Sequence, residues 1–275
     1  MSTRAKPAHS PAPTPRRPEL EALLNCCVAA ARAAALHALS NSARRRQATR
    51  RFAHDVKLAL DLESQRAAEA VIRRANPSHS ILGEEQSSGR GNNPWRWVID
   101  PIDGTVNFLH GSPWWCSSVA VQHEGRTVAG AVFGPEYDEL FTAHSAGPAL
   151  CNGRLIRVSD THAMGSALIC TGIVKQGAER KRSFLTFRRI TEACQKTRIQ
   201  GSAALDICSV ACGRADAFFE SGIYLWDVAA AGLIVERAGG RADYLKNGPG
   251  NRVHFLASNG IIHAALRRVL GRCGA

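Results

Sequence analysis

Two carboxylates stand three residues apart at the end of an apolar run, in the segment 97–105 that reads WVIDPIDGT. A strand that ends in Asp100 and Asp103 delivers two oxygen ligands for a cation. Gly104 and Thr105 follow, and their backbone N–H groups could bind an anion at the start of a helix or turn. Because Asp and Gly are also common in turns, this motif alone does not distinguish a metal site from a turn.

Further acidic residues stand at predicted strand ends and helix starts. Glu84 follows a short strand, Asp61 stands just before a predicted helix, and Asp227 begins a helix far downstream. A layered α/β fold gathers such positions into one crevice. Carboxylates that meet in a partly buried site repel one another unless cations lie between them. Oxygen ligands without His or Cys favour magnesium.

Hydrophobic periodicity predicts the elements that position these residues. In the first half we expect helices over 19–52 and 62–74, then strands at 80–82, 95–102, 117–122, 127–133 and 139–143. The strands at 117–122 and 127–133 read as an antiparallel hairpin. From about residue 155 we expect strands at 167–171, 215–220 and 254–257, and helices at 178–197, 203–212, 227–238 and up to Leu270. This order indicates a layered α/β architecture.

Composition excludes several classes of protein. The chain has 275 residues with 45% hydrophobic and 21% charged content, and its 24 Gly and 12 Pro follow no repeat, which rules out collagen and solenoids. No uninterrupted apolar run reaches the roughly 20 residues that span a bilayer, so we expect no membrane partner. The stretch 20–39 reads as an amphipathic helix rather than a signal peptide. Nine cysteines without CxxC or framework spacing favour a reducing cytoplasm over disulfides or zinc.

The chain is basic, with a formal net charge of +12. Residues 1–18 are basic and rich in proline, which predicts a disordered tail. Two further basic clusters, 44–51 and 180–189, could attract nucleic acid, an anionic membrane or a phosphorylated substrate. Solvated helix faces are the plainer interpretation of both clusters.

The chain resembles the inositol monophosphatase family of magnesium-dependent, lithium-sensitive phosphatases. The likeness rests on the segments 83–85 (GEE), 97–108, 201–206 (GSAALD), 226–232 (WDVAAAG) and 238–240, together with Arg198. It covers the chain from about Leu20 onward and implies an αβαβα sandwich over residues 19–275, with halves at about 19–150 and 151–275. It also implies a homodimer.

Carried over position by position, the resemblance implies a role for each site residue. A first magnesium would be held by Glu84, Asp100 and the carbonyl of Ile102, a second by Asp100, Asp103 and Asp227, and a third would contact Glu84 through water. Phosphate would bind the N–H groups of Gly104 and Thr105. Asp61 and the Thr105 hydroxyl would orient and deprotonate the attacking water, and Ala203 and Glu220 would contact the hydroxyl-bearing ring of the substrate.

The resemblance predicts magnesium-dependent hydrolysis of inositol monophosphate by in-line attack of water. Fructose-1,6-bisphosphatase, histidinol-phosphatase and nucleotide 3′-phosphatase activities are alternatives, as is an accessory role in a nucleic-acid or transcription complex. The chain departs from the family at two places. Lys57-Leu58 stand where many members have Val-Thr, and Trp114-Trp115 replace smaller residues. The tryptophans either narrow the substrate entrance or pack in the core.

Overall fold

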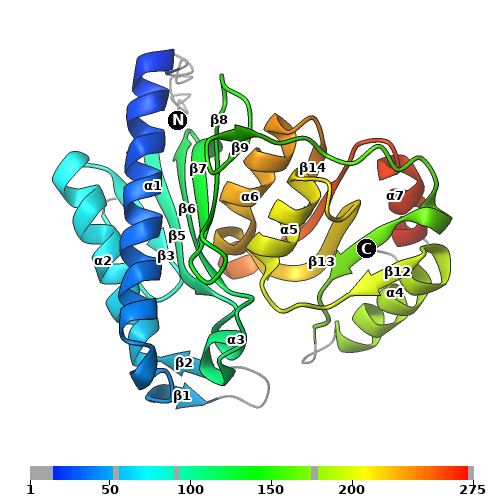
Figure 1. Ribbon diagram of the computed structural model, residues 1–275, viewed down its shortest axis with the longest axis horizontal. Helices are drawn as coiled ribbons and strands as arrows, with labels where there is room; N and C mark the ends of the chain where they lie inside the picture. Colours follow the sequence, from blue (N-terminus) through cyan, green and yellow to red (C-terminus); the bar gives the residue numbers. More distant parts are fainter. Residues whose placement is uncertain (1–14, 52–55, 90–92, 175–178, 272–275) are drawn as a thin grey trace, which may run out of the picture.

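The computed structural model describes residues 15–51, 56–89, 93–174 and 179–271. Two sheets and the helices around them form five layers in the order αβαβα (Figure 1). The fold class expected from the sequence is therefore confirmed. The tail predicted over residues 1–18 falls mostly on residues 1–14, which lie outside the described residues, but its last two residues are wrong, because the first helix begins at Arg17.

The first sheet has eight strands in the order β10-β9-β8-β7-β6-β5-β3-β4. Their bounds are β3 Ser80–Gly83, β4 Ser87–Ser88, β5 Trp95–Asp103, β6 Cys116–His123, β7 Arg126–Gly134, β8 Glu139–His144, β9 Leu150–Cys151 and β10 Arg154–Leu155. β5 lies between β3, to which it is parallel, and β6, to which it is antiparallel. The predicted hairpin is confirmed as β6 and β7.

The second sheet has five strands in the order β12-β11-β13-β15-β14. Their bounds are β11 Leu168–Thr171, β12 Lys196–Arg198, β13 Ala217–Tyr224, β14 Arg241–Asn247 and β15 Arg252–Ser258. β11 is parallel to β12 and β13, whereas β15 runs antiparallel to both of its neighbours. A separate two-stranded ribbon pairs β1 (Ala48–Arg51) with β2 (Val56–Leu58).

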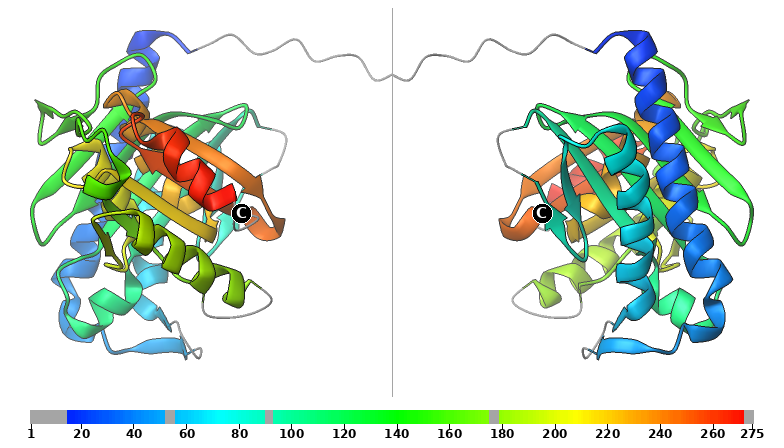
Figure 2. Two further views of the ribbon diagram at one scale, coloured as in Figure 1. Left: turned by 90° about the vertical axis from the view of Figure 1, so that its right-hand side faces the viewer. Right: turned by 90° about the vertical axis from the view of Figure 1, so that its left-hand side faces the viewer.

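Helices cover both faces of each sheet. α1 (Arg17–Ser40) and α2 (Ala59–Ala75) pack on the outer face of the first sheet, and α4 (Arg180–Ala193) and α7 (His263–Gly271) on the outer face of the second (Figure 2). α5 (Ala203–Ala211) and α6 (Leu225–Arg237) lie between the sheets. The short α3 (Thr105–His110) follows β5, and 3₁₀ turns occur at Ser42–Arg44, Met164–Ser166 and Pro249–Asn251.

The long helix α1 is a core helix in this structure. By length and mean hydropathy it could cross a membrane. Nine of its side chains are buried, however, and they form one core with α2 and with the strands β5, β6 and β7. Burial against a sheet therefore accounts for the apolar composition of this helix.

Two predicted helices are too long. The helix predicted over 19–52 ends at Ser40, where the Asn41 side chain donates to the carbonyl of His37 at 2.8 Å, and residues 48–51 form β1. The helix predicted over 178–197 ends at Ala193, because residues 196–198 pair with β11 as strand β12. The segments 48–51 and 196–198, predicted as the ends of these helices, are polar and basic. Each forms a strand because a neighbouring strand pairs with it. The prediction also missed β14.

Small residues let the central helices approach the first sheet closely. Gly130 lies on β7 against Ala230 of α6, and a Cβ atom built on Gly130 would lie 2.9 Å from both Cα and Cβ of Ala230. Real Cβ contacts are longer than this, so α6 would have to move away from the sheet. Since α6 carries Asp227, this contact also sets the position of a candidate site residue.

We expect Gly130→Ala to destabilise the protein by about 1–3 kcal/mol, because the added methyl group meets helix backbone that cannot rotate away. Urea unfolding followed by circular dichroism measures the change in free energy. Gly165→Ala is the matched control, because a Cβ atom at this exposed glycine meets no atom within 4 Å. Equal stability of the two variants would contradict the close contact between β7 and α6.

Candidate active site

A bulge in β5 brings two carboxylates to the same side of the sheet. Asp100 is paired with Ser118 and Asp103 with Cys116, so three steps along β5 oppose two steps along β6. Side chains three residues apart in a regular strand point to opposite faces. The extra residue of the bulge reverses that alternation. The spacing of Asp100 and Asp103 is thus compatible with one shared site only because the strand is irregular there.

Asp103 is anchored to the start of α5. Its Oδ2 atom accepts hydrogen bonds from Ser202 Oγ at 2.6 Å and from the backbone N–H of Ala204 at 2.7 Å. Its Oδ1 atom accepts a longer one, 3.3 Å, from the N–H of Ala203. Burial raises the pKa of Asp103, and these hydrogen bonds oppose that rise. The contact joins the first sheet to a helix that follows a hundred residues later.

Asp61 and Asp227 occupy equivalent places in two different helices. Each lies in the first turn, and one carboxylate oxygen accepts the backbone N–H three residues before it: from Leu58 at 2.6 Å and from Tyr224 at 2.8 Å. Asp61 therefore lies inside α2, not before it as predicted. The other oxygen of Asp61 is buried and has no hydrogen-bond partner among the described residues. Such an orphaned acceptor is costly unless a cation or water reaches it.

Three of the predicted metal ligands converge. Oxygen atoms of Asp100, Asp103 and Asp227 all lie within 4.8 Å of one another. Burial raises the pKa of Asp100 well above its usual range, and the charges of Glu84, Asp103 and Asp227 raise it further. Burial and the charges of Asp103 and Glu84 likewise raise the pKa of Asp227. The protein alone therefore opposes full ionisation of this group.

Glu84 reaches the same region from the loop after β3. Its backbone N–H donates to the carbonyl of Ile99 on β5 at 3.1 Å, which fixes the loop beside the carboxylate strand.

Burial raises the pKa of Asp61 to about 8, the hydrogen bond from the Leu58 N–H opposes this rise, and the charges of Glu84 and Glu85 add to it. Burial would lower the pKa of Lys57, but its hydrogen bond with Glu85 and the charges of Glu84, Glu85 and Asp61 raise it overall.

These residues fit a hard divalent cation. The converging groups are carboxylates, the Asp61 oxygen has no protein partner, and oxygen-only sites suit magnesium. The carbonyl oxygen of Ile102, also predicted as a ligand, already accepts the Thr105 hydroxyl at 3.0 Å. A carbonyl has two lone pairs, so this contact leaves one for a cation.

Gly104 and Thr105 join the bulged strand to α3. Gly104 has φ +91° and ψ 39°, and a Cβ atom there would meet the carbonyls of Trp114 and Gly201 at 3.0 and 3.1 Å. Glycine is therefore required at this position by backbone conformation and by space. The turn that follows presents the first N–H groups of α3, which have no partner within the helix.

A pocket of about 390 Å³ opens beside the three aspartates. Its lining consists of Asp103, Thr171, Gly172, Ile173, Ile199, Gly201, Ser202, Ala203, Asp206, Glu220, Ile223 and Asp227. Burial raises the pKa of Glu220 to about 7, and the charge of Asp103 adds to the rise. Both predicted substrate residues, Ala203 and Glu220, therefore lie in one pocket with two of the predicted metal ligands.

Sequence reasoning missed two residues that shape this pocket, Gly172 and Gln200. A Cβ atom at Gly172 would lie 2.1 Å from the carboxylate of Glu220, so glycine makes room for that side chain. Asp206 accepts hydrogen bonds from Gln200 Nε2 at 2.7 Å and from Trp114 Nε1 at 3.1 Å. No spacing rule links these residues, because Gly172 and Gln200 follow strands of the second sheet whereas Trp114 lies between α3 and β6.

The two tryptophans have different roles. Trp115 is buried, and its ring meets the edge of Phe108 at 4.8 Å between centroids, as expected for core packing. Trp114 is half-buried and holds Asp206, a residue of the pocket lining. Trp114 therefore packs against the central core and also holds Asp206 in place beside the pocket.

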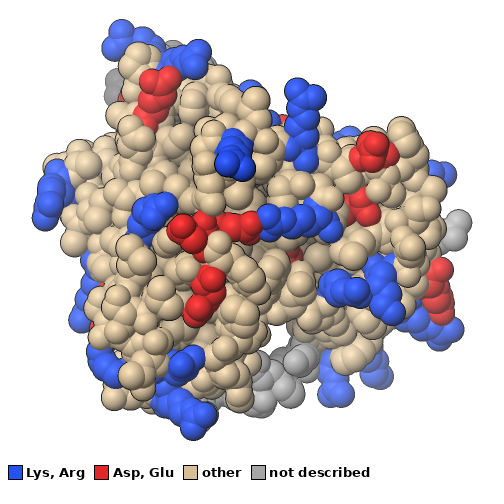
Figure 3. Space-filling model, viewed as in Figure 1, with Lys and Arg blue, Asp and Glu red and all other residues tan. Residues whose placement is uncertain are grey.

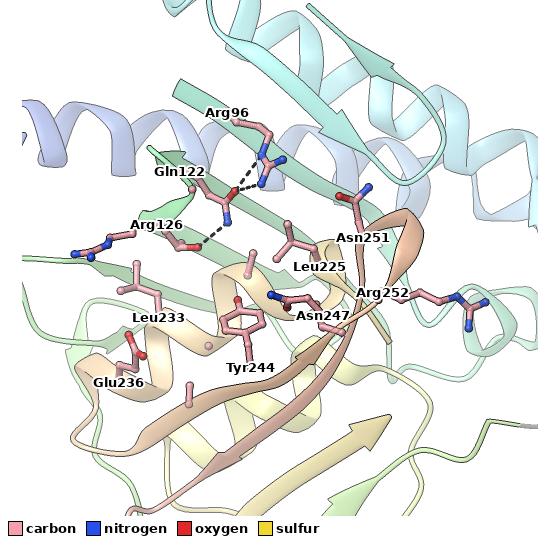
Figure 4. A pocket seen from close by; sticks show the side chains of 17 residues that line it. Arg96, Gln122, Arg126, Leu225, Leu233, Glu236, Tyr244, Asn247, Asn251 and Arg252 are labelled. Carbon is pink, nitrogen blue, oxygen red and sulfur yellow. Dashed lines mark hydrogen bonds between the residues drawn. The ribbon is translucent and has the colours of Figure 1, made fainter. Parts of the chain in front are cut away.

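A larger cavity, about 690 Å³, lies elsewhere, between the β6–β7 turn, α6 and β14 (Figure 4). Leu225 and Leu233 of α6 form part of its wall, and the Arg96 guanidinium there donates to Gln122 Oε1 at 2.7 and 3.1 Å. None of the predicted catalytic, metal or substrate residues lines it. Cavity volume alone would therefore select a site away from the carboxylate group, whereas the converging charges select the smaller pocket beside it.

Comparison with known proteins agrees with this geometry. A profile of the inositol monophosphatase family matches residues 19–272. The "Nus factor SuhB" of Pasteurella multocida is 36% identical over 253 residues, which is 90% of this chain and 92% of that protein. An inositol-1-monophosphatase of Rhizobium meliloti is 38% identical over 76% of this chain and 82% of its own length.

Solved structures give the same result. The inositol monophosphatase of an Anabaena species superposes with a TM-score of 0.79 at 34% identity and covers 92% of this chain and 96% of its own. The suhB suppressor protein of Bartonella henselae gives a TM-score of 0.84 at 31% identity, and the match covers 90% of this chain and 98% of that protein. The family match indicates a phosphatase of a metal-dependent class, and the layered fold and converging carboxylates agree with it. The chain belongs to the inositol monophosphatase family.

Asp206 should make stability depend on pH. Burial raises the pKa of Asp206 to about 8, opposed by the hydrogen bonds from Trp114 and Gln200. In the unfolded chain its pKa is about 3.9, so the folded state binds more protons between these values and stability falls as pH rises from about 4 to about 8. In EDTA, we expect Asp206→Asn to reduce this fall by on the order of 4 kcal/mol between pH 5.0 and pH 8.5.

Urea unfolding at pH 5.0 and pH 8.5 measures this effect. Asn keeps a carbonyl acceptor for both donors but does not titrate. Asp160→Asn, at an exposed position of the chain, is the control and should leave the fall unchanged. An identical fall in wild type and Asp206→Asn would show that Asp206 is ionised in the folded protein at neutral pH.

Proposed function

We propose that this protein is a magnesium-dependent phosphomonoesterase that hydrolyses inositol monophosphate. The observation that carries the proposal is the convergence of Asp100, Asp103 and Asp227 within 4.8 Å at the edge of a pocket that also contains Glu220. A phosphate at the carboxylates would place its alcohol group in that pocket. Membership of the inositol monophosphatase family supports the same substrate class.

The pocket chemistry suits a polyol. Glu220 and Asp206 present carboxyl groups, which can accept hydrogen bonds from ring hydroxyls or donate to them. Ile173, Ile199 and Ile223 supply apolar wall against which the carbon face of a ring can pack. The pocket volume of about 390 Å³ lies in the range of small-molecule sites and accommodates one six-membered ring.

The metal ligands in this proposal are Glu84, Asp100, the carbonyl of Ile102, Asp103 and Asp227. Bound magnesium supplies positive charge that stabilises the attacking and leaving oxygens of an in-line displacement. The protein itself holds the phosphate through the N–H groups of Gly104 and Thr105. The Thr105 hydroxyl donates to Ile102, so its oxygen can accept a hydrogen bond from a water molecule. Asp61 would accept the proton of that water.

A substrate panel tests the proposal. The purified protein is incubated with inositol 1-phosphate, fructose 1,6-bisphosphate, histidinol phosphate and a nucleoside 3′-phosphate, with magnesium and with or without lithium, and phosphate release is measured. We expect the highest kcat/KM for inositol 1-phosphate and inhibition by lithium. Asp227→Asn should lose activity by orders of magnitude. A higher kcat/KM for any other panel member would show that this compound, and not inositol 1-phosphate, is the preferred substrate.

The proposed pair Asp61 and Thr105 should behave as one unit. Thr105→Ala keeps the backbone N–H that holds phosphate but removes the hydroxyl, so kcat should fall about 10²-fold or more with KM little changed. Asp61→Asn should give a similar loss, and the double variant should be little worse than either. Thr105→Ser is the control and should keep substantial activity. Losses that multiply in the double variant would show that the two residues act independently.

A second candidate function is a role as an accessory factor of a transcription complex. Relatives such as that of Pasteurella multocida carry the name Nus factor, and basic side chains gather over α4 in Figure 3. Arg180, Lys181 and Arg182 of α4 are all exposed. RNA binding measured by fluorescence anisotropy should weaken steeply as salt rises, and replacing these three residues by Gln should reduce the slope. No RNA binding at low salt would contradict this function.

A homodimer remains a prediction from the family resemblance, and a cytoplasmic location remains a prediction from the nine cysteines. Sedimentation equilibrium measures the molecular mass in solution and so tests the homodimer directly.

A further inference from the structure

Lys57 brings a fixed positive charge to the acidic side of the site. Its Nζ atom lies 2.6 Å from Glu85 Oε1, to which it donates, and 3.9 Å from Glu84 Oε1. The Lys57 and Glu84 side chains keep 30% and 25% of their exposure, and Glu85 keeps 11%. The ion pairs are thus partly buried, where screening by solvent is weaker than at an open surface.

The position of Lys57 in the fold explains how it reaches these residues. It lies in β2, next to Leu58, whose backbone N–H donates a hydrogen bond to the Asp61 carboxylate at the start of α2. The ammonium contacts the Glu84–Glu85 loop, and its charge also acts on the Asp61 carboxylate. This is also where the chain departs from the Val-Thr of many family members.

A second side chain fixes the same loop from α2. Gln65 Oε1 accepts the backbone N–H of Glu85 at 2.9 Å, and Gln65 Nε2 donates to the carbonyl of Gln86 at 2.8 Å. A Cβ atom at Gly83 would lie 2.3 Å from the Gln65 side chain, so the loop and Gln65 fit tightly. Gln65 holds the backbone of the loop, whereas Lys57 holds its two carboxylates.

We propose that the Lys57 ammonium is a built-in counter-cation that positions the Glu84–Glu85 loop and competes with a divalent cation for Glu84. The inference rests on the proposed function, in which Glu84 is a metal ligand. In the metal-free protein, Lys57 offsets the repulsion of Glu84 and Glu85 and keeps the loop ordered. When a divalent cation binds, its charge and that of Lys57 repel each other across Glu84, which weakens binding.

Two consequences have opposite signs, and this distinguishes the proposal from a merely structural role. Removing the ammonium should loosen the metal-free loop, because two neighbouring carboxylates lose their counter-charge. The same change should tighten magnesium binding, because a competing cation is gone. A residue that only packed in the fold would weaken both properties together.

The experiment uses Lys57→Met, which keeps most of the side-chain length, and Lys57→Arg, which keeps the charge. Calorimetric titration of the EDTA-treated full-length protein with magnesium chloride measures the Kd. We expect Lys57→Met to lower the Kd on the order of tenfold, and Lys57→Arg to stay near wild type. Lys181→Met, an exposed lysine on α4, is the control for a general loss of positive charge.

Hydrogen exchange gives the second readout. In EDTA, amide exchange in the peptide that contains residues 80–89 should be faster in Lys57→Met than in wild type, and magnesium should restore the slow rate. An unchanged or higher Kd in Lys57→Met, or unchanged exchange, would overturn the role of Lys57. Asp100→Asn separates the two proposals: if wild type and Asp100→Asn bind magnesium equally, the proposed metal site itself is wrong.

Discussion

The repulsion between carboxylates that are forced together in a partly buried place is the constraint on which this structure depends. Asp100, Asp103 and Asp227 lie within 4.8 Å of one another, and Glu84 acts on two of them through its charge. In a medium of low polarity such a group cannot be fully ionised without positive charge nearby. A cation that binds the group therefore stabilises the fold and makes the chemistry possible at the same time.

The protein resists this repulsion by anchoring each carboxylate through backbone and hydroxyl donors. Asp61 and Asp227 cap the helices that carry them, and Asp103 accepts hydrogen bonds from groups at the start of α5. Each of these two carboxylates that cap a helix thus has one oxygen held by a backbone N–H, and the second oxygen of Asp61 meets no hydrogen-bond donor among the described residues. The close packing of α6 on β7 at Gly130 then places Asp227 opposite the strand that carries Asp100.

Much of the fold could be predicted, because its core elements have strong patterns. The apolar run of β5, the hairpin β6–β7 and the helices α2, α5 and α6 all follow from local periodicity. The polar pieces could not be predicted in the same way. β12 and β14 carry mostly polar side chains and are strands because a neighbouring strand offers hydrogen-bonding partners. Their structure depends on contacts with distant parts of the chain.

The sequence by itself determined the family, the acidic residue types and the layered α/β class, because these are properties of residue identity and order. It also showed Lys57 as a departure from the family, without showing what it contacts. Only the tertiary structure decided that a bulge places Asp100 and Asp103 on one side, that Gly172 makes room for Glu220, and that Lys57 meets Glu84 and Glu85. These depend on distances between segments far apart along the chain, which are set by packing and hydrogen bonding between layers rather than by local preference.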